Sequence, residues 1–288
     1  MPIDLDAAER FVLANARLLD RHRLALLRGT GSHERVLEAL RPYANPDGGF
    51  GHALEADARG PESEPVAGLA ALEILLEIDR ASDPAVDGIG AWVDAIADAD
   101  GGVPFVLPST ARSPHAPWMV PSDGGSHLTF AIAGALWHAR PDAPWLKRGT
   151  AWCWDRLARP ADLGSYSVKF ALAFLDAVPD ADRAAAAIEA LRPRLDADGA
   201  VPVEGGTDGE RLMPLTLAPR PAARSRALLT PGQVERELDA LEAAQQDDGG
   251  WTFDWLAWSP GQEVDGRGVV TLEALRTLAA HGRVDLAV

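Results

Sequence analysis

The chain of 288 residues has a single cysteine, Cys153, and only two lysines, Lys147 and Lys169. One cysteine cannot form an intrachain disulfide or supply a cysteine-based zinc site. Acidic residues outnumber basic ones by 43 to 27, which gives a formal net charge of −16. Such a surface repels phosphate groups, and the basic residues form no clusters, so we predict neither a nucleic-acid partner nor attachment to an anionic membrane.

Long apolar runs are also missing. No stretch approaches the roughly 18 apolar residues of a membrane span, and the N-terminus lacks the basic and apolar regions of a secretory signal. We therefore expect a soluble, cytoplasmic protein without a membrane span. No strand pattern is evident and no linker is long enough to separate domains, so the 47% hydrophobic content predicts one all-α domain, 1–288, with a substantial core.

The feature that the sequence repeats is an Asp-Gly turn. Each of four copies follows an amphipathic helical segment, and its glycine can adopt the positive φ that closes a helix. The copies begin at Asp47, Asp100, Asp198 and Asp248. Each turn leads through a loop to another helix, and three helices are apolar on nearly every face: Val66–Ile78, Leu128–Trp137 and Val168–Leu175. Helices of this kind have to be buried on all sides.

One-sided helices alternate with these all-round apolar ones, as two concentric shells require. We predict inner helices near 6–27, 64–79, 125–139, 165–177, 219–229 and 266–281, and outer helices near 33–43, 86–98, 143–158, 181–196 and 231–246. These eleven helices predict an (α/α)6 toroid with one outer helix missing or irregular. The helix at 219–229 begins only at Ala222, because Pro219 and Pro221 precede it. Gly205 to Pro221 are expected to form a long surface or lid loop.

Gln245 and Trp251 flank the last turn with the spacing Q-x-x-x-G-x-W. This spacing resembles the QW repeat of squalene–hopene cyclases and of the related terpenoid cyclases and prenyltransferases, which share the α/α-toroid fold. The resemblance implies that Gln245 and Trp251 are structural ties between a helix and its turn. The other three turns carry Ala44, Ala97 and Leu195 at the glutamine position, so one copy is complete and three are degenerate.

The catalytic motifs of that superfamily are absent. The acid motif D-x-D-D would protonate an alkene, but its nearest counterpart, Asp98-Ala-Asp100-Gly101, departs at the last position and forms a repeat turn. The magnesium motif D-D-x-x-D is missing as well, and Cys153 stands alone on a predicted outer helix. The resemblance therefore implies a small apolar or isoprenoid-like ligand, while no metal and no cofactor are predicted.

One pattern in the loops occurs twice. The sequence E-x-D-x-R-G precedes the first buried helix after a turn and again the last buried helix, and a closed ring places these two repeats side by side. Carboxylates beside arginines can form a split acid/base pair in which one carboxyl is protonated and its partner ionised. The catalytic candidates are Glu55, Asp57, Glu263 and Asp265, with Arg59 and Arg267 as ligand-binding and orienting residues. The alternative is that these charges cap inner helices and cross-link the closing repeats.

Aromatic and histidine side chains complete the predicted ligand-binding set. Its members are His52, His115, Trp118, His127, Tyr166, Trp255 and Trp258. Loop tryptophans at a barrel mouth can stack on a sugar or stabilise a carbocation, or they can simply plug the barrel end. Two metal sets are conceivable, His52 with Glu55 and Asp57, or His115 with Asp123 and His127. Neither has a tight ligand spacing such as H-E-x-x-H, so no metal is predicted.

Three functions fit these features. The first is an isoprenoid-processing enzyme that uses a carboxylic acid, without metal, to cyclise or isomerise an apolar substrate. The second is a carbohydrate-active (α/α)6 enzyme with paired carboxylates and platform tryptophans. The third is a non-catalytic ligand-binding or scaffold toroid. The lining of the central cavity distinguishes them, and the sequence leaves open the substrate, the oligomeric state and catalysis itself.

Overall fold

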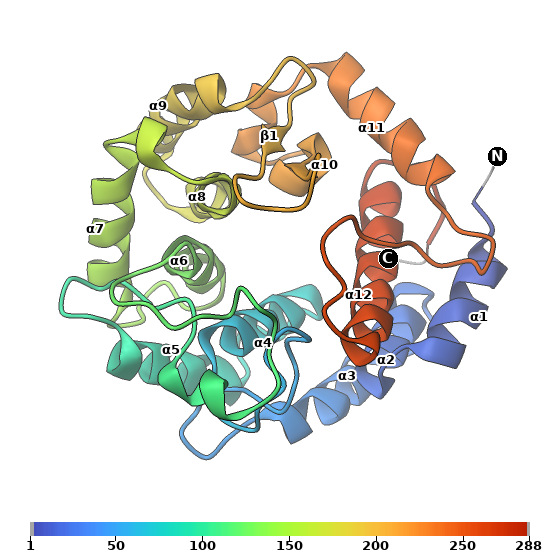
Figure 1. Ribbon diagram of the computed structural model, residues 1–288, viewed down its shortest axis with the longest axis horizontal. Coiled ribbons are helices and arrows are strands. Elements are labelled where there is room, and N and C mark those ends of the chain that lie inside the picture. The colour runs from blue at the N-terminus through green and yellow to red at the C-terminus, as the bar shows by residue number, and fades with distance from the viewer. Residues whose placement is uncertain (1–2, 287–288) are drawn as a thin grey trace.

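A computed structural model describes residues 3–286, which form two concentric shells of helices (Figure 1). The outer helices are α1 (Leu5–Asn15), α3 (His33–Leu40), α5 (Pro84–Ile96), α7 (Leu146–Leu157), α9 (Ala181–Leu191) and α11 (Pro231–Ala243). The inner helices are α2 (Leu18–Leu27), α4 (Pro65–Glu77), α6 (Leu128–Ala139), α8 (Ser165–Ala177), α10 (Pro214–Leu217) and α12 (Pro260–Ala280). The predicted all-α toroid is therefore confirmed. No helix in the described residues is both long and apolar enough to cross a membrane.

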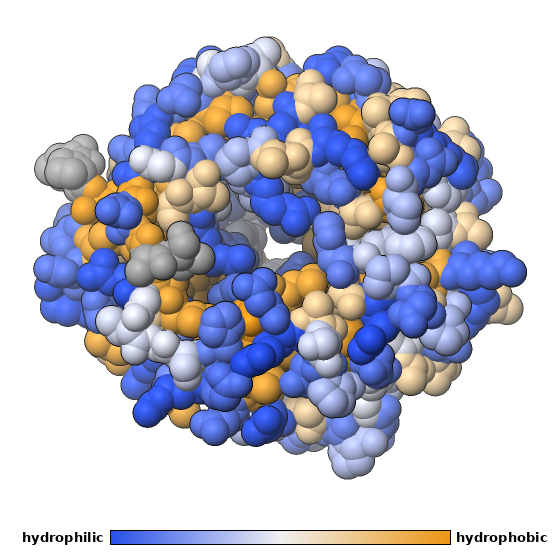
Figure 2. Space-filling model, turned by 180° about the vertical axis from the view of Figure 1, so that it is seen from behind, coloured by the Kyte–Doolittle hydropathy of each residue, from blue (hydrophilic) through white to orange (hydrophobic). Residues whose placement is uncertain are grey.

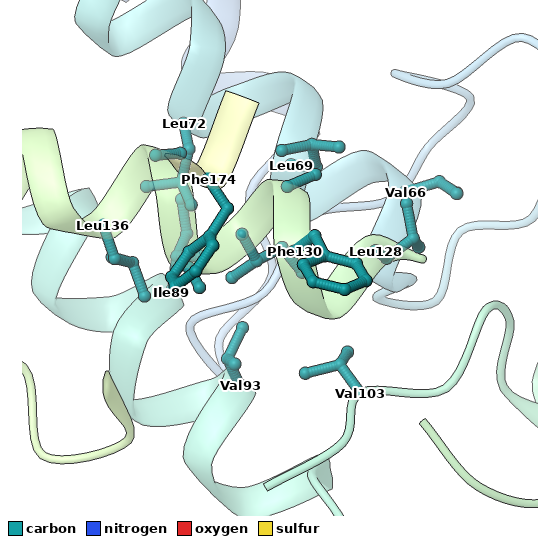
Figure 3. Close-up of a cluster of buried hydrophobic side chains, with 14 of the residues drawn as sticks. Val66, Leu69, Leu72, Ile89, Val93, Val103, Leu128, Phe130, Leu136 and Phe174 are labelled. Atoms are coloured by element: carbon teal, nitrogen blue, oxygen red, sulfur yellow. The ribbon is translucent and has the colours of Figure 1, made fainter. Parts of the chain in front are cut away.

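The core lies between the two shells. Helix α6 packs against α4, α7 and α8, and nearly all of its residues are buried, as its all-round apolar sequence requires. Figure 3 shows how the shells interlock: Phe130 of α6 lies among Leu69 of α4, Val93 of α5 and Phe174 of α8. The three predicted inner helices in this region, Val66–Ile78, Leu128–Trp137 and Val168–Leu175, are confirmed.

The prediction of one inner helix over 6–27 is wrong. The backbone is extended at Ala16 and Arg17, with ψ of 163° and 156°, and this break separates outer α1 from inner α2. Arg17 holds the break, because its guanidinium donates to Asp20 Oδ2 at 2.7 Å and to the Leu54 carbonyl at 2.7 Å. Helix α1 is the outer helix that seemed to be missing.

The inner helix predicted at 219–229 is also wrong. A short 3-10 helix covers Arg224–Leu228, and the inner position is taken by α10, which contacts α8 and α11. Before α10, an unpredicted antiparallel pair joins β1 (Val201–Pro202) to β2 (Arg211–Leu212). Residues 203–210 connect these strands as a loop. The long loop predicted over Gly205 to Pro221 is therefore only partly correct, because β2 and α10 lie within it.

Gln245 and Trp251 help to close the ring. The Gln245 side chain accepts from the Asp4 N–H at 2.9 Å and donates to the Asp4 carbonyl at 2.9 Å, at the start of α1. The Trp251 indole donates to the Leu241 carbonyl of α11 at 2.8 Å. Gly249 between them has φ of +92°, and a Cβ there would lie 2.3 Å from the Ala7 backbone, so no larger residue fits this approach of turn and helix.

Candidate functional site

Two loop segments that are distant in sequence pair at the mouth of the ring. The Arg59 N–H donates to the Pro114 carbonyl at 3.1 Å, and the Ala116 N–H donates to the Asp57 carbonyl at 2.9 Å. This short antiparallel bridge fixes the segment before α4 against residues 113–119. As a result, Trp118 is held beside the carboxylate of Asp57.

Asp57 is the centre of the site. Trp118 Nε1 donates to Asp57 Oδ2 at 3.0 Å, and Trp258 Nε1 donates to Asp57 Oδ1 at 3.1 Å. Burial raises the pKa of the Asp57 carboxyl, and hydrogen bonds from Trp118, Trp258 and Gln262 partly oppose the rise. The site thus brings three predicted residues together around one partly desolvated carboxyl group.

Glu55 adds a second carboxyl group close by. Its Oε1 accepts the backbone N–H of Asp57 at 3.4 Å. Burial, followed by the charge of Asp57, raises the pKa of Glu55 to about 7. The two carboxyl groups therefore share one environment in which ionisation of either opposes ionisation of the other.

Arg59 connects the first copy of the E-x-D-x-R-G pattern to the last. Its Nη1 donates to Asp265 Oδ2 at 2.9 Å, and both side chains are half-buried. This contact joins the segment before α4 to helix α12 across the closing point of the ring. The first and last repeats therefore meet as expected through this ion pair, although Asp265 is the one charged residue of the second copy that it brings there.

The second copy departs from prediction, because α12 begins at Pro260 and not near 266. Ser259 starts the helix by accepting the Gln262 N–H on its hydroxyl at 3.2 Å. Glu263 is consequently an exposed residue of the first helical turn. Arg267, expected to orient the carboxylates, instead donates to both oxygens of Asp248 at 2.8 Å. Neither residue is brought to Asp57.

An aromatic wall lies between α6 and α8. The His127 ring stacks on Phe170 at 5.5 Å and lies 4.9 Å from Phe105 and 6.0 Å from Tyr166. Burial, and then the charge of Lys169, lower the pKa of His127 to about 4, so its ring is neutral at pH 7. Tyr166 donates to Glu210 Oε1 at 3.2 Å. Its pKa is raised by burial and by Glu210, and it also responds to the charge of Asp57.

Three predicted residues lie outside the group around Asp57. His52 is exposed and its Nε2 pairs with Asn45 Oδ1 at 3.0 Å. His115 bonds the Ser113 carbonyl through Nδ1 at 2.7 Å, and Trp255 stacks on Phe253 at 4.4 Å. Within residues 3–286, no three His, Cys, Asp or Glu side chains gather as a metal would need.

Charged side chains line the interior of the ring. Figure 2 shows an opening at its centre, with hydrophilic residues on much of its rim. Glu73 of inner helix α4 has an accessible side chain, yet protein surrounds it, and burial raises its pKa to about 7. Lys169 of α8 opposes the rise and Glu273 of α12 adds to it. The side chains inside the ring are therefore aromatic around His127 and charged around Glu73.

Sequence reasoning missed Gln262, Phe105 and Phe170. Phe105 follows an Asp-Gly turn and Phe170 is one of many apolar residues in α8, so neither is distinguished from core by type or spacing. The last helix was predicted to start near 266, which placed Gln262 in the preceding loop. Nothing in the sequence of that loop indicated that its side chain is buried. Its burial becomes apparent only from the structure, in which α12 begins at Pro260 and includes Gln262 in its first turn.

Several solved structures share this fold. A protein from Actinoplanes matches with a TM-score of 0.57 and 20% identity over 95% of this chain and 99% of that one. The type II terpene cyclase MstE from Scytonema matches at 12% identity as complexes with its substrate geranylgeranyl dihydroxybenzoate and its product merosterolic acid A. Their TM-scores are 0.58 and 0.60, over 96% and 97% of this chain and 96% of each MstE chain. No protein-family model matches the sequence, and no curated protein matches it. At these identities the likeness shows a terpene cyclase-like fold.

Proposed function

We propose that this protein is an isoprenoid-processing enzyme that cyclises or isomerises its substrate by proton transfer from Asp57, without a metal ion. The observation that carries the proposal is the Asp57 carboxyl group, which combines a raised pKa with indole N–H donors on both of its oxygens. The first feature keeps the acid protonated at higher pH than an ordinary aspartate. The second stabilises the carboxylate that remains after the proton has left.

The reaction begins with transfer of the Asp57 proton to one carbon of an alkene. A new C–H bond forms and the neighbouring tertiary carbon becomes a cation. The π electrons of a second alkene then form a C–C bond to that carbon, or the cation loses a proton directly. The carboxylate of Asp57 is the base that accepts the final proton, so the overall reaction is an isomerisation and needs no other reactant.

The surrounding groups suit such a cation. Aromatic faces attract a positive charge through their ring quadrupole. Phe105, His127, Tyr166 and Phe170 form such a wall, and its Tyr166 lies near enough to Asp57 for the charge of that carboxylate to affect its pKa. The neutral state of His127 avoids a competing charge in that wall. The fold neighbour MstE acts on a geranylgeranyl compound, and this supports an isoprenoid-type substrate by analogy of fold.

The arrangement favours this reaction over carbohydrate cleavage. Glycosidases place two carboxyl groups on opposite sides of the bond that they cleave. Here Glu55 and Asp57 are two residues apart on one segment, Asp265 is paired with Arg59, and Glu263 is exposed away from them.

Deuterium incorporation tests the proposal. The protein is incubated in D2O with geranylgeraniol and with geranylgeranyl dihydroxybenzoate, and the products are examined by mass spectrometry. Proton-initiated cyclisation adds one deuterium to an isomer of the starting compound. We expect Asp57→Asn to abolish this product with an unchanged melting temperature.

Asp254→Asn is the matched control, because Asp254 is an exposed aspartate in the loop that leads to Trp258. The Asp254→Asn variant should form the deuterated product at the rate of the parent protein. Deuterated product from Asp57→Asn at the rate of the parent protein would overturn the role of Asp57, and the absence of a product from both compounds would count against an isoprenoid cyclase.

A further inference from the structure

Gln262 is the most deeply buried polar residue of the mouth. It belongs to the first turn of α12, four residues after Trp258, and its side chain is only 2% exposed. Its Oε1 atom is closed to solvent and has no hydrogen-bond partner within residues 3–286. Buried acceptors in native proteins are nearly always paired, so an unpaired one beside a functional carboxylate needs an explanation.

The orientation of the Gln262 amide follows from Asp57. Its N–H side faces the Asp57 carboxylate, where it lowers the carboxyl pKa. Exchange of the two amide atoms would place an oxygen against an ionised carboxylate, which is repulsive. Once Asp57 has given up its proton, the acceptor is therefore the atom that is left over, and its donor has to come from another molecule.

The absence of a side chain at Gly266 lets the Phe253 ring pack close to this amide. Gly266 follows Gln262 by one helical turn, and a Cβ at that position would lie 2.8 Å from the Phe253 ring and 3.6 Å from Gln262 Nε2. Aromatic residues thus border an amide whose acceptor is unused.

We propose that the ligand of this site is an oxygenated isoprenoid, with a hydroxyl or phenol group that donates a hydrogen bond to Gln262 Oε1. This inference rests on the proposed function and narrows it, because a pure hydrocarbon would leave the amide oxygen without a donor once Asp57 is ionised. Gln262 is then a specificity-determining residue that places the oxygenated end of the ligand beside Asp57.

Two matched probes test this inference. Farnesol and farnesyl methyl ether have the same carbon chain, but only the alcohol can donate a hydrogen bond. Both are titrated while tryptophan fluorescence is followed, since Trp118 and Trp258 lie in the site. We expect the alcohol to bind about tenfold more tightly, as one hydrogen bond to a buried acceptor would provide.

In Gln262→Met, which keeps the length of the side chain and removes the acceptor, the two probes should bind equally. Gln246→Met is the control, because Gln246 is exposed at the outer turn and bonds only the Ala244 carbonyl; the preference for the alcohol should persist there.

The outcomes separate this inference from the proposed function. Equal binding of the alcohol and the ether by the unaltered protein overturns the need for a donor, while it leaves an isoprenoid ligand in place. A preference for the alcohol that survives in Gln262→Met overturns the role of Gln262. Failure of both probes to bind overturns this inference together with the isoprenoid proposal. The comparison in the unaltered protein does not depend on whether the variant folds.

Discussion

The two copies of E-x-D-x-R-G have the same residues in the same order but different surroundings. In the first copy Glu55 is half-buried with a raised pKa, Asp57 accepts two indole N–H groups and Arg59 reaches across to α12. In the second copy Glu263 is exposed, while Asp265 faces the mouth and Arg267 faces the outer turn at Asp248. One copy forms a site and the other supports it.

Backbone conformation causes this difference. Residues 51–60 form an irregular segment, so each side chain direction is set by local contacts. The second copy lies within α12, where residues two apart point in different directions and residues four apart share a face. An identical pattern therefore has a different meaning in a loop and in a helix.

The largest expected contrast in stability is between the two arginines. Arg267→Ala removes a two-pronged ion pair with Asp248, a bond to the Trp251 carbonyl at 3.2 Å and a guanidinium stacked 4.5 Å above the Phe11 ring. We expect a loss of about 2 kcal/mol in the free energy of unfolding, measured by urea denaturation. The affinity of this variant for the probe farnesol should equal that of the parent protein.

Arg59→Ala provides the comparison. Its single ion pair with Asp265 is partly exposed, so the loss of stability should be smaller, about 1 kcal/mol, while probe binding should weaken. If Arg267→Ala weakened binding and left stability unaffected, the distinction between site and support would be wrong.

Much of the fold could be predicted from the sequence because its inner helices are apolar on every face, and only burial between two shells satisfies that pattern. The break between α1 and α2 could not be predicted, because the apolar residues on its two sides continue one helical spacing through it. These residues are Phe11, Val12, Leu18 and Leu19. That break depends on contacts of Arg17 with Asp20 and Leu54, which are set by tertiary structure.

The site was predictable in part for the same reason. Asp57 was a candidate because the E-x-D-x-R-G pattern occurs twice, and Trp118 and Trp258 were candidates because they are tryptophans in loops; closure of the ring brings the three together. The roles of Glu263 and Arg267 were not predictable, because they depend on where α12 begins. Three glycines near that point suggested a loop, whereas Ser259 and Pro260 start the helix earlier.

The next contrast concerns pH. The pKa of Glu55 is about 7 in the folded protein and near 4.5 when unperturbed, so between these values the folded state binds more protons than the unfolded state. Stability from this group is complete below about pH 4.5 and is lost as the pH rises to about 7. In the Glu55→Gln variant the side chain cannot ionise, so the variant does not lose this stability as the pH rises.

We therefore expect the variant to gain about 1 to 2 kcal/mol relative to the parent protein between pH 5 and pH 8, after allowance for partial exposure. Urea denaturation at several pH values measures the difference. Glu73 titrates in the same range in both proteins, so only the difference between them is informative. A constant difference across this range would show that Glu55 is ionised throughout.

The smallest effect is expected at Glu263, the counterpart of Glu55 in the second copy. Its side chain is exposed, and its only evident contribution is the favourable position of a negative charge in the first turn of α12. Alanine has a higher helix propensity and offsets part of that loss, so Glu263→Ala should change the free energy of unfolding by less than about 0.5 kcal/mol. The pH dependence of stability and the affinity for farnesol should both match the parent protein. If Glu263→Ala instead lowered affinity as strongly as Arg59→Ala, the two copies would have to act together in ligand binding. The difference in their backbone conformation would then not separate their roles.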